Sequence, residues 1–138
     1  MRTRTVLAAA TTTAALLTAG LVPAAAAPAP AAPSAAAVSP AADFFCTSGP
    51  GYTCPTGNLC ARVRDPTVGK YKVFKFYNCN TYALSNWEDT GGYANRQTGS
   101  RATAKFYGQS GNVLRSVPVG ESIQGYGWSP VWKIRNCY

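Results

Sequence analysis

The stretch LCARVRDPTVGKYKVFKFY, residues 59–77, decides the fold class. Apolar residues at positions 59, 61 and 63 alternate with polar ones, which is the period of a half-buried β-strand with Arg62 and Arg64 on its solvent face. Residues 65–69 (DPTVG) are turn formers, and residues 71–77 are rich in aromatic and β-branched types. The stretch therefore predicts two strands joined by a tight turn.

The rest of the chain shows the same kind of pattern. Residues 102–107 alternate apolar and polar side chains, residues 108–112 (GQSGN) predict a turn, and residues 113–117 continue as a strand. Residues 131–136 (VWKIRN) predict a closing strand with Trp132 and Ile134 on one face. Because no stretch keeps the apolar stripe of an amphipathic helix for three turns, we predict an all-β domain.

A faint internal repeat extends this prediction. Ala61 and Ala104 are 43 residues apart, Gly69 and Gly111 are 42 apart, and Trp87 and Trp128 are 41 apart. A period near forty with four short strands predicts two Greek-key units packed as one sandwich. Chance alignment of Gly and Trp in a Gly-rich chain is the alternative interpretation.

The N-terminus has the composition of a secretory signal peptide. Residues 1–26 contain Arg2 and Arg4, then an apolar run and small residues before a cut after Ala26. We therefore expect a secreted, extracellular protein with no membrane span in the mature chain. Residues 27–42 contain only Ala, Pro, Ser and Val and predict a tether or propeptide, which leaves the β-domain in residues 43–138.

Charge and composition exclude several function classes. The chain has no histidine, which removes Ser-His-Asp and Cys-His catalysis and the zinc sites that use imidazole. We expect no cofactor and no metal. Thirteen Lys and Arg against five Asp and Glu give a charge of +8, and without Arg2 and Arg4 it is +6. The cations form no basic run, which argues against nucleic-acid binding and leaves an anionic wall polymer as a partner.

The carboxylates of the chain provide little support for a catalytic function. A glycosidase needs two acids across a cleft, and Glu88 with Glu121 is the only pair worth considering. We predict that the protein is not an enzyme.

The five cysteines predict disulfides, because an exported chain meets an oxidising environment. They lie at positions 46, 54, 60, 79 and 137, and five allow fifteen two-bridge connectivities that spacing does not distinguish. In the chain-entropy model, a Cys54–Cys60 bridge contributes roughly 2 kcal/mol and a Cys79–Cys137 bridge roughly 4 kcal/mol. We take Cys46, next to the tether, as the unpaired one.

The segment CPTGNLC, residues 54–60, resembles the C-P-x-G-x-[LVF]-C opening of the small secreted peptidase inhibitors typified by the Streptomyces metalloproteinase inhibitor. Residues 79–87 (CNTYALSNW) and 129–137 (SPVWKIRNC) also resemble secreted actinobacterial proteins grouped with that family, so the resemblance covers roughly residues 54–137. It implies a βγ-crystallin-like sandwich of two Greek-key motifs, a local Cys54–Cys60 bridge and inhibition of a metalloprotease.

The chain also departs from that family. The inhibitory member presents its protease-facing segment on a second short disulfide loop, whereas Cys79 and Cys137 are far apart here. The acidic stretch at residues 86–92 does not match the [DN]-[DN]-x-x-[ST]-S motif of a βγ-crystallin calcium site. The resemblance therefore predicts the fold better than the activity.

A protease inhibitor presents a rigid loop whose ordering cost the scaffold has already met. Three segments have loop composition: the turns at residues 65–70 and 108–112, and residues 87–99. We expect a monomer that blocks an extracellular protease through contacts in these loops, made by Asp65, Thr67, Lys70, Tyr93, Arg96 and Gln109.

Two other functions fit the same composition. One is a non-enzymatic binding module for cell-wall or polysaccharide ligands, which would stack sugars on exposed rings, and the other is a small basic antimicrobial protein. We expect most large rings in the core, namely Phe74, Phe76, Phe106, Trp132 and Trp87 or Trp128. We expect an outer face to be lined by Tyr71, Tyr77, Tyr82, Tyr107 and Tyr126.

Overall fold

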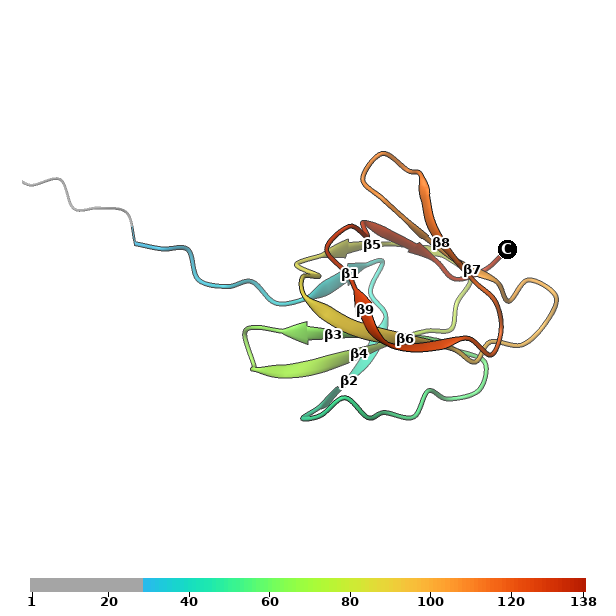
Figure 1. Ribbon diagram of the computed structural model, residues 1–138, viewed down its shortest axis with the longest axis horizontal. Coiled ribbons are helices and arrows are strands. Elements are labelled where there is room, and N and C mark those ends of the chain that lie inside the picture. The colour runs from blue at the N-terminus through green and yellow to red at the C-terminus, as the bar shows by residue number, and fades with distance from the viewer. Residues whose placement is uncertain (1–28) are drawn as a thin grey trace, which may run out of the picture. The chain divides into compact units, whose positions relative to one another are not determined.

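The computed structural model describes residues 29–138, of which Ala31–Tyr138 form one unit. Ten strands build this unit (Figure 1): β1 (Ala37–Ser39), β2 (Asp43–Thr47), β3 (Leu59–Asp65), β4 (Lys70–Phe76), β5 (Thr81–Ser85), β6 (Thr90–Asn95), β7 (Ala104–Tyr107), β8 (Val113–Val117), β9 (Ser122–Gly127) and β10 (Lys133–Arg135). No helix occurs in residues 29–138, so this range holds none that could cross a membrane. The all-β prediction is confirmed.

The strands form two antiparallel sheets that enclose the core. The first sheet has the order β1-β5-β10-β7-β8, and the second has the order β2-β4-β3-β6-β9. Their inner faces meet through aromatic rings and aliphatic side chains, among them Leu59, Phe76, Tyr93, Phe106, Trp128 and Ile134. Two sheets packed face to face are the arrangement that period-two patterning favours, because each strand buries every second side chain.

The predicted hairpin at residues 59–77 is present. β3 and β4 pair over their whole length, from Leu59 opposite Phe76 to Asp65 opposite Lys70. In a second hairpin, the predicted turn at residues 108–112 joins β7 to β8. The register of this pair shifts between Phe106 and Tyr107. Both turns are therefore where the turn residues predict them.

The two halves of the domain exchange one strand each. β3, β4 and β6 lie in the second sheet, while β5 joins the first; β7, β8 and β10 lie in the first sheet, while β9 joins the second. β5 pairs with β10, and β9 pairs with β6. Each sheet therefore needs a strand from the other half.

Buried asparagines repeat across the halves with the 41-residue offset that separates Trp87 from Trp128. The Nδ2 of Asn95 donates to the Val117 carbonyl at 2.9 Å, and the Nδ2 of Asn136 donates to the Phe76 carbonyl at 3.2 Å. Phe76 and Val117 are themselves 41 residues apart. The repeat thus extends to hydrogen bonds between the halves. Each asparagine occupies the same position in its half and donates to the equivalent carbonyl of the other half.

Part of the segment expected to be a tether is folded. β1 lies within residues 27–42 and pairs with β5, and Ala36 is buried against the core. The indole Nε1 of Trp87 donates to the Ala37 carbonyl at 2.9 Å. The pairing depends on backbone groups and small side chains, which is why the Ala-rich composition did not reveal it. The expected signal peptide, residues 1–26, lies outside the described residues.

Arg62 is buried, which corrects the expectation that it faces solvent. Its side chain does lie on the outer face of the second sheet, but residues 48–58 run across that face and cover it. The guanidinium donates to the carbonyls of Pro50, Gly91 and Gln124 and lies over the Tyr71 ring, 4.8 Å from its centroid. Period-two patterning identifies the face on which a side chain lies but not whether another segment of the chain covers that face.

Three further expectations about rings are wrong, because Trp132 is exposed and Tyr82 and Tyr126 pack with the core. Trp132 is 48% exposed, because Val131 and Ile134 fill the core positions at the start of β10. Tyr82 is buried, and its hydroxyl donates to the Asn78 carbonyl at 2.9 Å. Trp87 and Trp128 are both in the core, with ring centroids 5.0 Å apart in an edge-to-face arrangement.

The disulfides join Cys54 to Cys60 and Cys79 to Cys137, and Cys46 is free and exposed. The first bridge lies at the start of β3. The second ties the end of the chain, after β10, to the connection between β4 and β5.

Candidate functional site

The β3–β4 turn, residues 65–70, is held by its first residue. Asp65 is fully buried, and its Oδ1 accepts hydrogen bonds from the backbone N–H of Thr67 at 2.9 Å and from the Thr67 hydroxyl at 2.6 Å. The N–H of Gly69 donates to the Asp65 carbonyl at 3.1 Å, and Gly69 has a φ of 62°, a conformation that favours glycine. Three hydrogen bonds therefore fix a turn of six residues.

Asp65 also forms an ion pair inside the fold. The Lys72 ammonium lies 2.5 Å from Oδ2 of Asp65, and the Lys72 side chain is only 14% exposed. Burial opposes ionisation of the carboxyl, but hydrogen bonds from Lys72 and Thr67 outweigh it and lower the pKa of Asp65 to about 2. Asp65 thus supports the turn from within, which corrects its predicted role as a protease contact.

The tip of the turn projects into solvent at one end of the sandwich (Figure 1). Thr67 and Lys70, two predicted contact residues, are exposed there. Val68, which was not among the predicted contact residues, lies between them and is 52% exposed. An apolar side chain at the centre of a polar turn was the signal that could have identified it.

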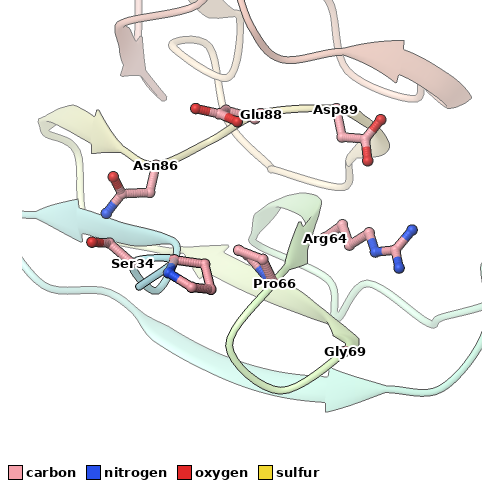
Figure 2. A pocket seen from close by; sticks show the side chains of 8 residues that line it. Ser34, Arg64, Pro66, Gly69, Asn86, Glu88 and Asp89 are labelled. Carbon is pink, nitrogen blue, oxygen red and sulfur yellow. The ribbon is translucent and has the colours of Figure 1, made fainter. Parts of the chain in front are cut away.

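A cavity of about 420 Å³ lies beside the turn. Pro66 and Gly69 of the turn, Arg64 of β3, and segments at residues 33–34 and 86–89 form its walls. Figure 2 shows Glu88 and Asp89 on one side of the cavity and Arg64 and Pro66 on the other. The turn is thus bordered by a cavity whose walls carry both signs of charge.

The β5–β6 connection on the far side of this cavity is also well anchored. Asn86 and Asp89 have φ values of 59° and 70°, which non-glycine residues rarely adopt. Asn86 donates through Nδ2 to the Ala35 carbonyl at 2.9 Å, and the Asp89 carbonyl accepts from the N–H of Trp128 at 3.1 Å. These contacts hold the wall of the cavity in place.

The second predicted turn, residues 108–112, is tight but small. The N–H of Gly108 donates to the Asn112 carbonyl at 2.9 Å, and the Ser110 hydroxyl donates to Oδ1 of Asn112 at 2.7 Å. Gln109 is exposed at the tip, where its neighbours are glycine and serine. This turn offers a partner no large apolar side chain.

The predicted loop at residues 87–99 contains a strand at its centre, which is a correction. β6 occupies its centre and pairs with β3 and β9. A Cβ on Gly91 would lie 1.9 Å from the backbone oxygen of Arg62, so this glycine serves close strand packing and not loop flexibility. A Gly-rich composition is compatible with a flexible loop and with closely packed strands, so it does not distinguish them.

Tyr93, on β6, is fully buried and cannot be the contact residue that we predicted. Its hydroxyl donates to Glu121 and accepts from Nε of Arg115, and Arg115 also pairs with Glu121 at 2.8 Å. Burial, followed by the hydrogen bond to Glu121, raises the pKa of Tyr93. The exposed Arg96 follows β6, at the opposite end of β3 from the turn, where its N–H donates to Asn58.

Glu88 and Glu121 do not face each other across a cleft. Glu88 precedes β6, whereas Glu121 lies beside its last residue, since its carbonyl accepts from the N–H of Asn95. The strand between them spans about 15 Å, beyond the roughly 5–9.5 Å that separates glycosidase carboxylates. The hydrogen bond from Tyr93, followed by that from Arg115, lowers the pKa of Glu121, which suits an ion pair and not a general acid.

The part of the chain that the structure describes holds no cluster of three His, Cys, Asp or Glu side chains suited to a metal ion. Comparison with protein-family models gives no match, and comparisons with curated proteins and with solved structures give none either.

Proposed function

We propose that the protein is a secreted, non-enzymatic inhibitor of an extracellular protease and that the β3–β4 turn enters the protease cleft. The observation that carries the proposal is the buried carboxylate of Asp65, which fixes the turn from inside while Thr67 and Val68 project outward. A turn that is already ordered loses little conformational entropy when it binds.

The chemistry of the tip suits a substrate-binding cleft. Val68 would bury an apolar side chain in a pocket of the protease, and the backbone of Thr67 is held in a single conformation by Asp65. Lys70 and Arg64 flank the tip and would attract an acidic cleft. The neighbouring cavity gives room for a rim of the protease beside the turn.

We also propose that the sandwich is βγ-crystallin-like, with one Greek key in each half. The exchange of β5 and β9 between the sheets supports this topology. The Cys54–Cys60 bridge at the start of β3 agrees with what the resemblance of residues 54–60 implies. A metalloprotease target rests on that resemblance alone.

The test measures residual activity of thermolysin-type, subtilisin-type and papain-type proteases with excess purified protein. We expect inhibition of the thermolysin-type enzyme, and we expect Val68→Asp to abolish it, because the charge would have to be buried in the cleft. Val119→Asp is the matched control, since Val119 is 54% exposed and Val68 is 52% exposed.

Full activity of all three proteases would refute inhibition. Equal loss in the two valine variants would refute the β3–β4 turn as the contact, and inhibition of a different protease class would refute the metalloprotease target.

A further inference from the structure

The outer face of the first sheet gathers three cations that lie apart in the sequence. Ile134 points into the core, so its neighbours Lys133 and Arg135 point outward from β10. Arg135 lies directly opposite Lys105 of β7, and Lys133 lies directly opposite Tyr107. We call Lys105, Lys133 and Arg135 the basic face.

Two of these cations, Lys105 and Arg135, repel each other across the paired strands. Like charges directly opposite on paired strands repel each other. The other residues paired with the basic face are Thr81 and Ala83 on β5 and Ser116 on β8, none of which carries a charge. Uncharged small side chains also keep the surface around the cations flat.

The side-chain carboxylates of the described residues lie elsewhere. Asp43, Asp65 and Glu121 pair with Lys75, Lys72 and Arg115, respectively. Glu88 and Asp89 belong to the cavity beside the β3–β4 turn. The three cations of the basic face form no ion pair with any described side chain, so their charge is available to a ligand.

A tyrosine positions two of these cations. The Lys105 ammonium lies 3.6 Å from the centroid of the Tyr138 ring, and the Arg135 guanidinium carbon lies 5.2 Å from it. The Tyr138 hydroxyl is hydrogen-bonded to that of Tyr107. The cation–π contacts draw both side chains to one ring and so hold two like charges close together.

The two sheets differ in how their outer faces are used. On the second sheet, Pro50 and Tyr52 contact Arg62, which is buried. On the first sheet, Thr81, Ala83, Lys133 and Ser116 are exposed. This open face of the first sheet therefore carries the three cations of the basic face.

We propose that the basic face binds phosphate groups of a linear polyanion. Lys105 and Arg135 lie on neighbouring strands, about 5 Å apart, so one tetrahedral phosphate could accept from both, while Lys133 lies about 7 Å along β10 to meet the next. A carboxylate has only two oxygens for the same donors. The proposal does not depend on the proposed inhibition, because the basic face and the β3–β4 turn share no residue.

The test compares binding of the full mature chain to inorganic polyphosphate, to polyglutamate and to neutral dextran by titration at several salt concentrations. We expect binding to polyphosphate, at least tenfold weaker binding to polyglutamate and none to dextran. Lys133→Gln with Arg135→Gln should weaken polyphosphate binding at least tenfold, and the slope of log K against log salt should become shallower by about 1.5.

The control is Arg64→Gln with Arg96→Gln, which removes the same charge from exposed sites away from the basic face. Equal weakening in the two double variants would mean attraction by net charge alone and would overturn the proposal. No binding to polyphosphate at low salt, or equal binding to polyglutamate, would overturn it as well.

A stability measurement separates ligand binding from a structural role. Lys133→Gln removes an exposed cation that makes no ion pair and no cation–π contact with the described residues, so we expect its urea midpoint to be no lower than that of the wild type. A lower midpoint would show that Lys133 is needed for the fold, contrary to the proposal. Protease inhibition measured on the same variant should be unchanged. The experiment can therefore refute binding by the basic face without refuting protease inhibition by the β3–β4 turn.

Discussion

At the scale of single residues, Asp65 connects the stability of the fold to the shape of the candidate site. One oxygen of its carboxylate accepts from Thr67, and the other meets the Lys72 ammonium. The Lys72 ammonium also donates to the Ala36 carbonyl at 3.2 Å. The residue therefore links the turn, β4 and the N-terminal arm, residues 29–47, in one buried polar network.

Replacing Asp65 with Asn should lower the free energy of unfolding at pH 7 by about 2 kcal/mol, because Lys72 loses its buried partner. Asp43→Asn is the control, since the Asp43 side chain is 88% exposed and 3.8 Å from Lys75, and an exposed pair contributes at most about 0.5 kcal/mol. Urea denaturation of the two variants and the wild type measures the difference. Equal effects would contradict the role assigned to the buried pair.

The Asp65 carboxyl should also make stability depend on pH. Its folded-state pKa of about 2 lies below the usual 3.8, so its contribution is fully present above pH 4 and disappears as the pH falls toward 2. The gap between wild type and Asp65→Asn should therefore close over that interval. A gap that stays constant down to pH 2 would mean that the carboxylate is not stabilised by folding.

At the scale of elements, β1 and β2 cover neighbouring edges of the two sheets. β1 pairs with β5 at the edge of the first sheet, and β2 pairs with β4 at the edge of the second. β8 and β9, the strands at the opposite edges, have no second neighbour among the described residues. The N-terminal arm thus protects one pair of edges, and a covered edge is less prone to pair with other chains.

Deleting residues 27–39 should destabilise the domain by about 2–4 kcal/mol, since it removes the β1 ladder and uncovers core side chains. Trp87 loses its hydrogen bond to the Ala37 carbonyl, so its fluorescence should shift to longer wavelength. Deleting only residues 27–34 is the control and should change neither quantity, because it leaves β1 intact. If the longer deletion behaved like the shorter one, β1 would not contribute to the folded domain.

At the scale of the whole molecule, the exchange of β5 and β9 makes the halves interdependent. Each sheet contains a strand from the other half, and Asn95 and Asn136 each donate to a strand of the other half. Neither half can lose its structure without breaking the ladder and the buried hydrogen bonds of its partner. The Cys79–Cys137 bridge adds a covalent link across the same division.

Asn95→Ala and Asn136→Ala should each lower the free energy of unfolding by about 2–3 kcal/mol, because buried backbone groups lose their partners. Unfolding should nevertheless remain a single transition in both variants, with coincident curves from tryptophan fluorescence and far-UV circular dichroism. Two separated transitions would show that the halves unfold independently.

Strand positions were predictable where apolar residues alternate with polar ones. In residues 59–63 and 104–107 every second side chain is apolar, because Leu59, Ala61, Val63, Ala104 and Phe106 point into the core. The same reasoning failed for β6, whose buried glycines have loop composition, and for β1, whose residues are mostly small. In both strands the deciding contacts are between backbones, which side-chain patterns do not report.

The candidate site was predictable only in its outline. The position of the β3–β4 turn follows from the residues DPTVG, but the burial of Asp65 and the exposure of Val68 depend on β4 and the N-terminal arm. Tyr93 has the chemistry of an interface residue and is a core residue, because two strands flank β6.

By itself, the sequence determined the all-β class, the two hairpins and the residues available for disulfides, because alternation, turn chemistry and cysteine content act over short distances. Tertiary structure alone decided that Arg62 is covered, that Asp65 is paired and that Lys105 lies opposite Arg135. These features arise when strands distant in the chain come into register, and pairing between distant strands is not encoded in either strand alone.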